Sequence, residues 1–167
     1  MSELARLEEH IPALRRYAWA LLRNDSDADD LVQDCLVKAL DRMDTLVGES
    51  AMRPWLFSIM HNLSVSRWRA LRVRAGVMVE SPQADATVAP RQQISAELQE
   101  TLRHLANLPH DQQRVLLLVG VEGFGYGEAA KILGVPVGTV MSRLSRARDS
   151  LRGSAEHQQK PLLRRVK

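Results

Sequence analysis

The most distinctive polar residues of the chain lie between positions 137 and 148, where arginine and hydroxyl side chains recur at helical spacing. An arginine can donate two hydrogen bonds to a guanine edge, and Ser or Thr can bind phosphates or bases. Solvated helix faces also carry such residues, so DNA binding is indicated only in combination with what precedes this segment. At 100° per residue, one side of it carries Gly138, Thr139, Ser142, Arg143, Ser145 and Arg146.

The residues before this face have the features of a helix-turn-helix. Ala129 and Ala130 are small enough for a second helix to pack closely, and Gly134 suits the left-handed position that ends a helix. A turn of three or four residues containing glycine joins the two helices of this DNA-binding unit. We therefore predict helices at 126–133 and 137–151, the second of which reads DNA. Its inner, apolar side would consist of Val137, Val140, Met141, Leu144, Ala147 and Leu151.

Other kinds of chemistry have weaker support. Gly123, Gly125 and Gly127 have G-x-G-x-G spacing after a helical segment, whereas a dinucleotide loop needs G-x-G-x-x-G after a strand. No histidine has metal-ligand spacing with Cys35. Because Cys35 lies on an apolar helix face, we expect it to be buried rather than nucleophilic. The sequence thus favours a protein that is not an enzyme and that uses no cofactor and no metal.

Length and composition limit the class of protein further. The chain has 167 residues, of which 45% are hydrophobic, enough for one ordinary domain or two small ones. No apolar run approaches the roughly 20 residues that a membrane-spanning helix needs. The first residues include Glu3, Glu8 and Glu9, whereas a secretory signal begins with basic residues. We expect a soluble, cytoplasmic protein with no membrane insertion and no small-molecule substrate.

The net charge of +3 hides an asymmetry along the chain. Residues 1–50 carry 6 basic and 11 acidic side chains, whereas residues 101–167 carry 11 basic and 5 acidic ones. Different charges at the two ends suggest different partners, and the basic end is the candidate for nucleic acid.

Apolar residues recur every three or four positions through most of the chain, which predicts an all-α fold. In the N-terminal part, one helix is expected from Leu4 to about Arg23. A second is expected to be capped by Ser26 and to run to about Met43, and a third to span 54–72.

The stretch from 73 to 93 has no clear period and contains prolines, so we expect a flexible linker there. Helical spacing resumes at Ile94, and Pro109 is expected to begin a further helix. The predicted organisation is therefore an N-terminal domain, a linker, a C-terminal domain and a tail. Their expected bounds are 1–72, 73–93, 94–153 and 154–167.

Three motifs in this order resemble the extracytoplasmic-function group of the sigma-70 family. They are Asp27-Ala-Asp-Asp-Leu-Val-Gln-Asp34, Arg53-Pro-Trp-Leu-Phe-Ser-Ile-Met-His-Asn-Leu63, and Leu108-Pro109 with Arg114 followed by the helix-turn-helix. The resemblance covers about Leu14 to Arg152 and implies two helical domains, sigma regions 2 and 4. It implies a protein that binds core RNA polymerase and directs promoter recognition. The glycine-rich segment 123–128 also resembles the branch used in alphaproteobacterial general stress responses.

The resemblance assigns roles to matching residues. Region 4 would bind the -35 promoter element with the six residues of the 138–146 face. Region 2 would dock on the polymerase clamp helices through Asp29, Asp30, Leu31, Gln33 and Asp34. It would bind the melted -10 element through Arg53, Ser58, Asn62, Arg67, Trp68 and Arg69. Trp55 and Phe57, which lie among apolar neighbours, are expected in the core.

Two positions depart from the family pattern. Met141 stands where many relatives have a basic residue, and Ser145 stands where a larger side chain is common, so the -35 preference is open. The resemblance also implies an anti-sigma partner that covers both domains. One alternative is a sigma-like decoy that binds an anti-sigma protein without reading DNA, against which Arg143 and Arg146 argue. A repressor with the same DNA-binding unit would bring a ligand-binding or dimerisation domain, which the N-terminal block does not resemble.

Overall fold

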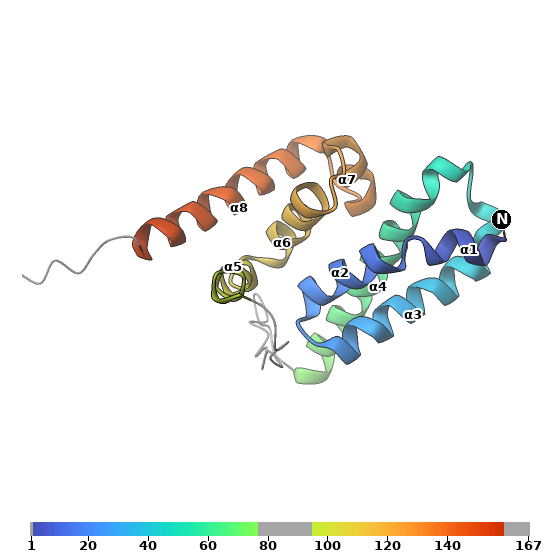
Figure 1. Ribbon diagram of the computed structural model, residues 1–167, viewed down its shortest axis with the longest axis horizontal. Helices are drawn as coiled ribbons and strands as arrows, with labels where there is room; N and C mark the ends of the chain where they lie inside the picture. The colour runs from blue at the N-terminus through green and yellow to red at the C-terminus, as the bar shows by residue number, and fades with distance from the viewer. Residues whose placement is uncertain (1, 77–94, 159–167) are drawn as a thin grey trace, which may run out of the picture.

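The computed structural model describes residues 2–76 and 95–158, and these residues form helices in two groups (Figure 1). We call 2–76 the N-terminal domain and 95–158 the C-terminal domain. The N-terminal domain contains α1 (Glu3–Glu8), α2 (Ile11–Leu22), α3 (Asp25–Asp41), the short turns η1 (Met43–Thr45) and η2 (Glu49–Ala51), and α4 (Met52–Ala75). The C-terminal domain contains α5 (Ala96–Ala106), α6 (His110–Leu116), η3 (Leu117–Val121), α7 (Tyr126–Leu133) and α8 (Val137–Gln158).

The first expected helix is two helices, so the prediction of one continuous helix to Arg23 is wrong. The chain turns at Glu9 and His10, and Pro12 occupies the first turn of α2. Proline has no N–H to donate, and its ring would clash with the carbonyl of Glu8 four residues earlier. A helix can therefore begin at this proline but cannot pass through it.

The beginning of α3 is capped two residues earlier than expected. The Asn24 side chain accepts a hydrogen bond from the backbone N–H of Asp27 at 2.9 Å, whereas Ser26 was expected to be the cap. Asparagine is among the best capping residues, and two aspartates in the first turn favour the positive end of the helix.

The core of the N-terminal domain lies where α2, α3 and α4 pack together. Leu14, Leu31 and Leu56 are fully buried there, as is Phe57, which confirms the expectation of a core position for that phenylalanine. Cys35 is also buried, as predicted, and burial raises the pKa of its thiol to about 12. A thiol held in its protonated form is a poor nucleophile, so the packing role is the one that the structure supports.

In the C-terminal domain, the predicted helix 126–133 is confirmed as α7, and Pro109 caps the start of α6. The helix α8 begins at Val137 as predicted but continues to Gln158, beyond the expected end at 151 and into the expected tail. Of the expected linker, residues 73–75 continue α4, and 77–93 lie outside the described residues. None of the described helices is both long and apolar enough to span a membrane.

One turn of the C-terminal domain is wider than an α-helix. At η3 the backbone N–H of Glu122 donates to the carbonyl of Leu117 at 2.9 Å, five residues earlier, which defines a π-helical turn. The chain then bends through Gly123, whose φ of +75° is a conformation that glycine adopts without strain. This turn and bend separate α6 from α7 and determine where Glu122 points.

The two domains pack against each other along α2 and α4 (Figure 1). The rings of Phe57 in α4 and Phe124 before α7 meet edge to face, with centroids 5.0 Å apart. The guanidinium of Arg23, at the end of α2, donates to the backbone carbonyl of Leu102 in α5. The buried apolar residues of both domains thus form one continuous cluster in this closed arrangement.

Candidate nucleic-acid interface

The helix-turn-helix has the local geometry that the sequence predicted. Gly134 ends α7 with a φ of +65°, which confirms its assignment to the left-handed position. The Glu128 carboxylate accepts a hydrogen bond from the Gly125 N–H at 3.2 Å and caps the start of α7. Val140, Leu144 and Ala147 of α8 are buried against the domain, so the opposite side of this helix must face outward.

The residues of the predicted -35 face lie on this outward side. Gly138, Ser142, Ser145 and Arg146 are exposed, and Thr139 is half-buried. The hydroxyl of Ser142 donates to the Thr139 carbonyl at 3.1 Å, which leaves its lone pairs accessible.

Arg143 differs from the other members of this face because it already has a partner in the protein. Its guanidinium lies 3.4 Å from the carboxylate of Asp111 in α6, and its side chain is 26% exposed. A guanidinium has five donors, so this contact orients Arg143 without using up its capacity to bind DNA.

The expected inner side of α8 is partly exposed. Val137 and Met141, which we predicted to pack inward, are 43% and 52% exposed. Both lie in the first turns of α8. An apolar Met141 beside the reading face can contact an apolar group such as a thymine methyl, but it cannot neutralise a phosphate.

The residues assigned to the -10 element all lie on α4, but they differ in exposure and in the contacts that they make in the closed arrangement. Asn62 and Arg69 are exposed. The hydroxyl of Ser58 donates within its own helix to the Pro54 carbonyl at 3.0 Å. Arg67 is bound to Asp34 of α3 at 2.6 Å.

Trp68 and Arg53 are in contact with the C-terminal domain. The Trp68 ring lies 6.1 Å from that of His110 in α6, and its indole nitrogen is buried without a partner. Arg53 donates to the Glu122 side chain at 3.2 Å and to the Glu122 carbonyl at 2.7 Å. Two of the six residues expected to bind the -10 element are thus in contact with the other domain.

The residues assigned to polymerase docking are exposed on α3, with the exception of Leu31. Asp30 and Gln33 are exposed, and Asp29 is exposed although it pairs with Arg15 at 2.7 Å. Leu31 is fully buried, so it packs into the core beneath the predicted docking residues and is not itself accessible to a partner.

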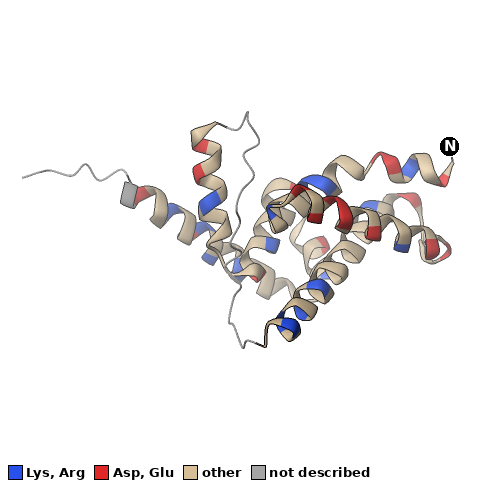
Figure 2. Cartoon of the chain, turned by 90° about the horizontal axis from the view of Figure 1, so that it is seen from below, with Lys and Arg blue, Asp and Glu red and all other residues tan. Residues whose placement is uncertain are grey.

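The charge asymmetry of the sequence is also an asymmetry in space. Figure 2 shows acidic side chains gathered over the end of the molecule that holds α1 and α3, whereas basic side chains follow α8 and the end of α4. An acidic surface on one domain and a basic surface on the other suit two different partners.

The domain interface also buries polar groups whose burial the sequence did not indicate. Tyr17 of α2, His61 of α4 and Arg114 of α6 each have a buried polar atom without a hydrogen-bond partner. Burial, together with the charge of Arg114, lowers the pKa of His61 to about 4, and Asp111 offsets part of this effect. Burial likewise raises the pKa of Tyr17 and lowers that of Arg114.

Glu122 and Arg16 are the most prominent residues that sequence reasoning missed. The side chain of Glu122 is fully buried, and Arg16 binds it from α2 across 106 positions of sequence. One signal was available, since Glu122 is a lone acid between the apolar stretch 115–121 and Phe124. An isolated acid in such a stretch indicates a buried, paired carboxylate, but nothing local names its partner.

The fold and this face define a DNA-binding protein of two helical domains with a helix-turn-helix in the second. Comparison with known families gives matches for both domains: the "Sigma2 domain of PhyR" model matches residues 7–61, and the "Sigma-70, region 4" model matches residues 98–151. The ECF RNA polymerase sigma factor EcfG of Rhodopseudomonas palustris is 40% identical over 147 residues, covering 84% of this chain and 78% of the relative.

Solved structures give the same result. The sigma factor RpoE in complex with the anti-sigma factor NepR, from Bartonella quintana, is 36% identical with a TM-score of 0.76, covering 90% of this chain and 94% of that one. CnrH in complex with the cytosolic domain of CnrY is 27% identical with a TM-score of 0.67, covering 90% and 85%. The chain therefore belongs to the extracytoplasmic-function (ECF) RNA polymerase sigma factors.

Proposed function

We propose that this protein binds core RNA polymerase in the cytoplasm through its acidic N-terminal surface and directs it to promoters through α4 and α8. The observation that carries the proposal is the outward face of α8, where exposed Arg146 and Ser145 stand on a helix held rigidly by Val140 and Leu144. Rigid placement of a basic, hydroxyl-rich face is what major-groove recognition requires. The same face argues against a decoy that does not read DNA.

Substitution of Arg146 tests the DNA-reading role. Because Arg146 is exposed, Arg146→Ala should leave folding and polymerase binding intact. It should weaken use of a cognate promoter by roughly 1–3 kcal/mol if the arginine binds a base, and weaken all promoters evenly if it binds a phosphate. The measurement is run-off transcription with core polymerase on promoters that differ in the -35 element. Arg152→Ala, which removes an exposed arginine from the same helix, is the matched control.

Loss of polymerase binding by Arg146→Ala would show that the two surfaces are assigned to the wrong partners. A promoter effect as large for Arg152→Ala as for Arg146→Ala would show a general charge effect instead of recognition by this face. Thermal melting of both variants accompanies the assay.

A charge reversal at Asp30 tests the docking surface. Asp30 is exposed on α3, and Asp30→Arg should reduce core polymerase affinity about tenfold because it opposes a basic partner with a like charge. Asp34 is less suitable, since an arginine there would face Arg67 within the domain. Affinity is measured by titrating labelled protein with core polymerase, with Glu97→Arg on α5 as the control. Unchanged affinity of Asp30→Arg would remove α3 from the docking surface.

We also propose regulation by an anti-sigma protein. A largely apolar groove of about 770 Å³ lies between α2 and the C-terminal domain, with Trp19 and Pro12 on one side and Leu102, Leu116 and Leu151 on the other. Both domains line it, so a partner bound there would favour the closed arrangement. The structurally similar RpoE was solved with the anti-sigma factor NepR, and CnrH with the cytosolic domain of CnrY, which supports a protein partner of this kind.

A further inference from the structure

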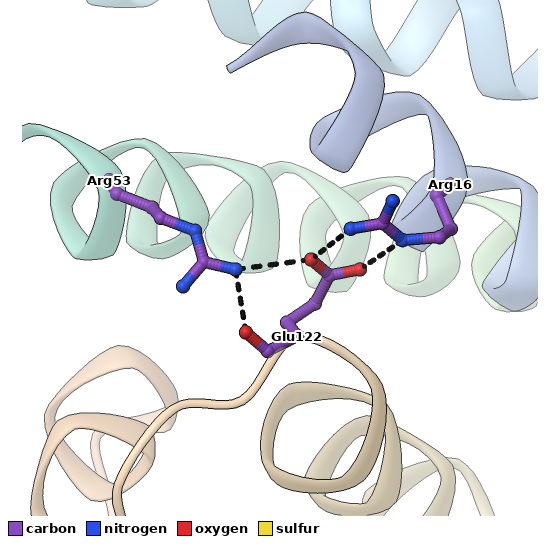
Figure 3. A network of polar contacts seen from close by, with 3 residues as sticks. All are labelled: Arg16, Arg53 and Glu122. Atoms are coloured by element: carbon purple, nitrogen blue, oxygen red, sulfur yellow. Dashed lines mark hydrogen bonds and ion pairs between the residues drawn. The ribbon is translucent and has the colours of Figure 1, made fainter. Parts of the chain in front are cut away.

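The polar contact between the domains centres on one carboxylate, that of Glu122 at the end of η3 (Figure 3). Arg16 donates to both of its oxygens, from Nε at 2.9 Å and from Nη2 at 2.8 Å. Arg53 donates from Nη2 to the carboxylate at 3.2 Å and to the carbonyl of the same residue at 2.7 Å. Both arginines come from the N-terminal domain, one from α2 and the other from α4.

The side chain of Glu122 is fully buried, whereas those of Arg16 and Arg53 are 53% and 34% exposed. A buried carboxylate loses its hydration, and that loss is tolerated only when hydrogen bonds and opposite charge replace the water. Every hydrogen bond that the structure gives this side chain comes from the other domain. The carboxylate therefore contributes to domain closure. It accepts no hydrogen bond from within the described part of the C-terminal domain.

Aromatic rings fix Arg53 in the same contact. Its guanidinium carbon lies 4.2 Å from the centroid of Phe124 in the C-terminal domain and 5.5 Å from that of Phe57 in its own helix. A cation above these ring faces is attracted to them. An arginine held by a carboxylate and two rings is withdrawn from solvent-borne ligands, including the phosphates of DNA.

Promoter reading requires a different arrangement of the two domains. The -10 and -35 elements are about 25 base pairs apart, which at 3.4 Å per base pair is roughly 85 Å of duplex. In the closed arrangement α4 packs against α7, the first helix of the helix-turn-helix, so the domain that would read the -35 element is held directly against the helix that would read the -10 element. The proposed function therefore needs the contacts of Glu122 to break before both elements can be bound.

We propose that Glu122 is an interdomain latch, which binds Arg16 and Arg53 to hold the free protein in a closed state that cannot read a promoter. The expected effect of the latch on transcription rests on the proposed function. The expected effect of the latch on the arrangement of the domains does not depend on the proposed function. Release of the latch frees Arg53 for DNA, uncovers Trp68 and lets the domains separate.

The test uses the full-length protein with Glu122→Gln, which keeps the shape of the side chain and removes its charge. We expect the ratio of closed to open molecules to fall about tenfold or more. The radius of gyration in small-angle X-ray scattering should increase, and transcription with limiting sigma factor should rise about fivefold, because more of the free protein is competent to bind. Glu97→Gln, which removes an exposed charge from α5, should change neither quantity.

Arg16→Ala provides a second variant that is on the surface and does not endanger folding. It should open the protein partly, and the double variant with Glu122→Gln should open it less than the sum of the two effects, since both remove one contact. Additive effects of the two substitutions, or an unchanged radius of gyration in Glu122→Gln at an unchanged melting temperature, would overturn the latch.

Two further outcomes separate the latch from the proposed function. Opening without any gain in transcription would overturn the claim that closure restrains promoter reading. If Glu122→Gln opens the protein while every form, wild type included, is inactive with core polymerase on all promoters tested, the proposed function fails and the conformational latch stands.

Discussion

Phe57→Ala is expected to lower the free energy of unfolding by about 3–5 kcal/mol, the largest effect of any substitution that we predict. Phe57 is fully buried, and its ring meets Tyr17 edge to face at 5.3 Å on one side and Phe124 at 5.0 Å on the other. Truncation to alanine leaves a cavity between α2, α4 and the loop before α7, which cannot all collapse into it. It also removes two aromatic contacts, each of which contributes roughly 0.5–1.5 kcal/mol.

Urea unfolding followed by tryptophan fluorescence measures this loss, because Trp19, Trp55 and Trp68 all belong to the N-terminal domain. Phe57→Leu keeps most of the apolar volume and should lose less than half as much stability as Phe57→Ala. A loss below about 1 kcal/mol for Phe57→Ala would contradict the packing described for α4.

Acidification is expected to destabilise the closed protein through His61. The pKa of this histidine is about 4 in the closed state and would be near 6.5 when the side chain is exposed. Since the depressed pKa favours the neutral form, its contribution is complete above pH 6.5 and is lost as the pH falls toward 4. The difference corresponds to about 2 kcal/mol at pH 5.

The measurement compares unfolding free energies at pH 7.5 and pH 5, a range in which most exposed carboxylates remain charged. His61→Gln cannot be protonated and should lose about 2 kcal/mol less than the wild type over this interval. His104→Gln, which alters a histidine of α5, should follow the wild type. Equal pH dependence in His61→Gln and wild type would mean that another group titrates in this range.

The parts of the fold that could be predicted from sequence are those that local residues determine. Gly134 ends α7 and Pro109 caps α6 because backbone conformation at these positions depends on one residue type. The predictions that were wrong also concern single residues at helix ends. Pro12 lies in the first turn of α2 although the apolar spacing runs through it. Asn24 caps α3 in place of Ser26, because both residue types cap helices well and they lie only two positions apart.

The kind of candidate site, a DNA-binding helix face, was predictable from sequence, but the contacts that its residues make in the closed arrangement were not. The face around Arg146 is periodic, so its exposure could be predicted from helical geometry. The pairing of Arg53 with Glu122 could not be, because 69 positions separate them and no periodic pattern connects residues of different domains. Leu31 shows a related limit, since a residue inside a docking motif can be the part that holds the helix to the core.

Because Glu122 follows the π-helical turn at η3, the contact of Glu122 with the N-terminal domain depends on the number of residues in that turn. A π turn holds one residue more than the α-helix around it, and each residue of an α-helix rotates the next by about 100°. Loss of a single residue between Leu117 and Val121 would restore regular winding and swing Glu122 away from Arg16 and Arg53. Among descendants of this chain, a deletion of one codon would therefore remove the latch and favour the open state, without altering any residue that touches DNA or polymerase.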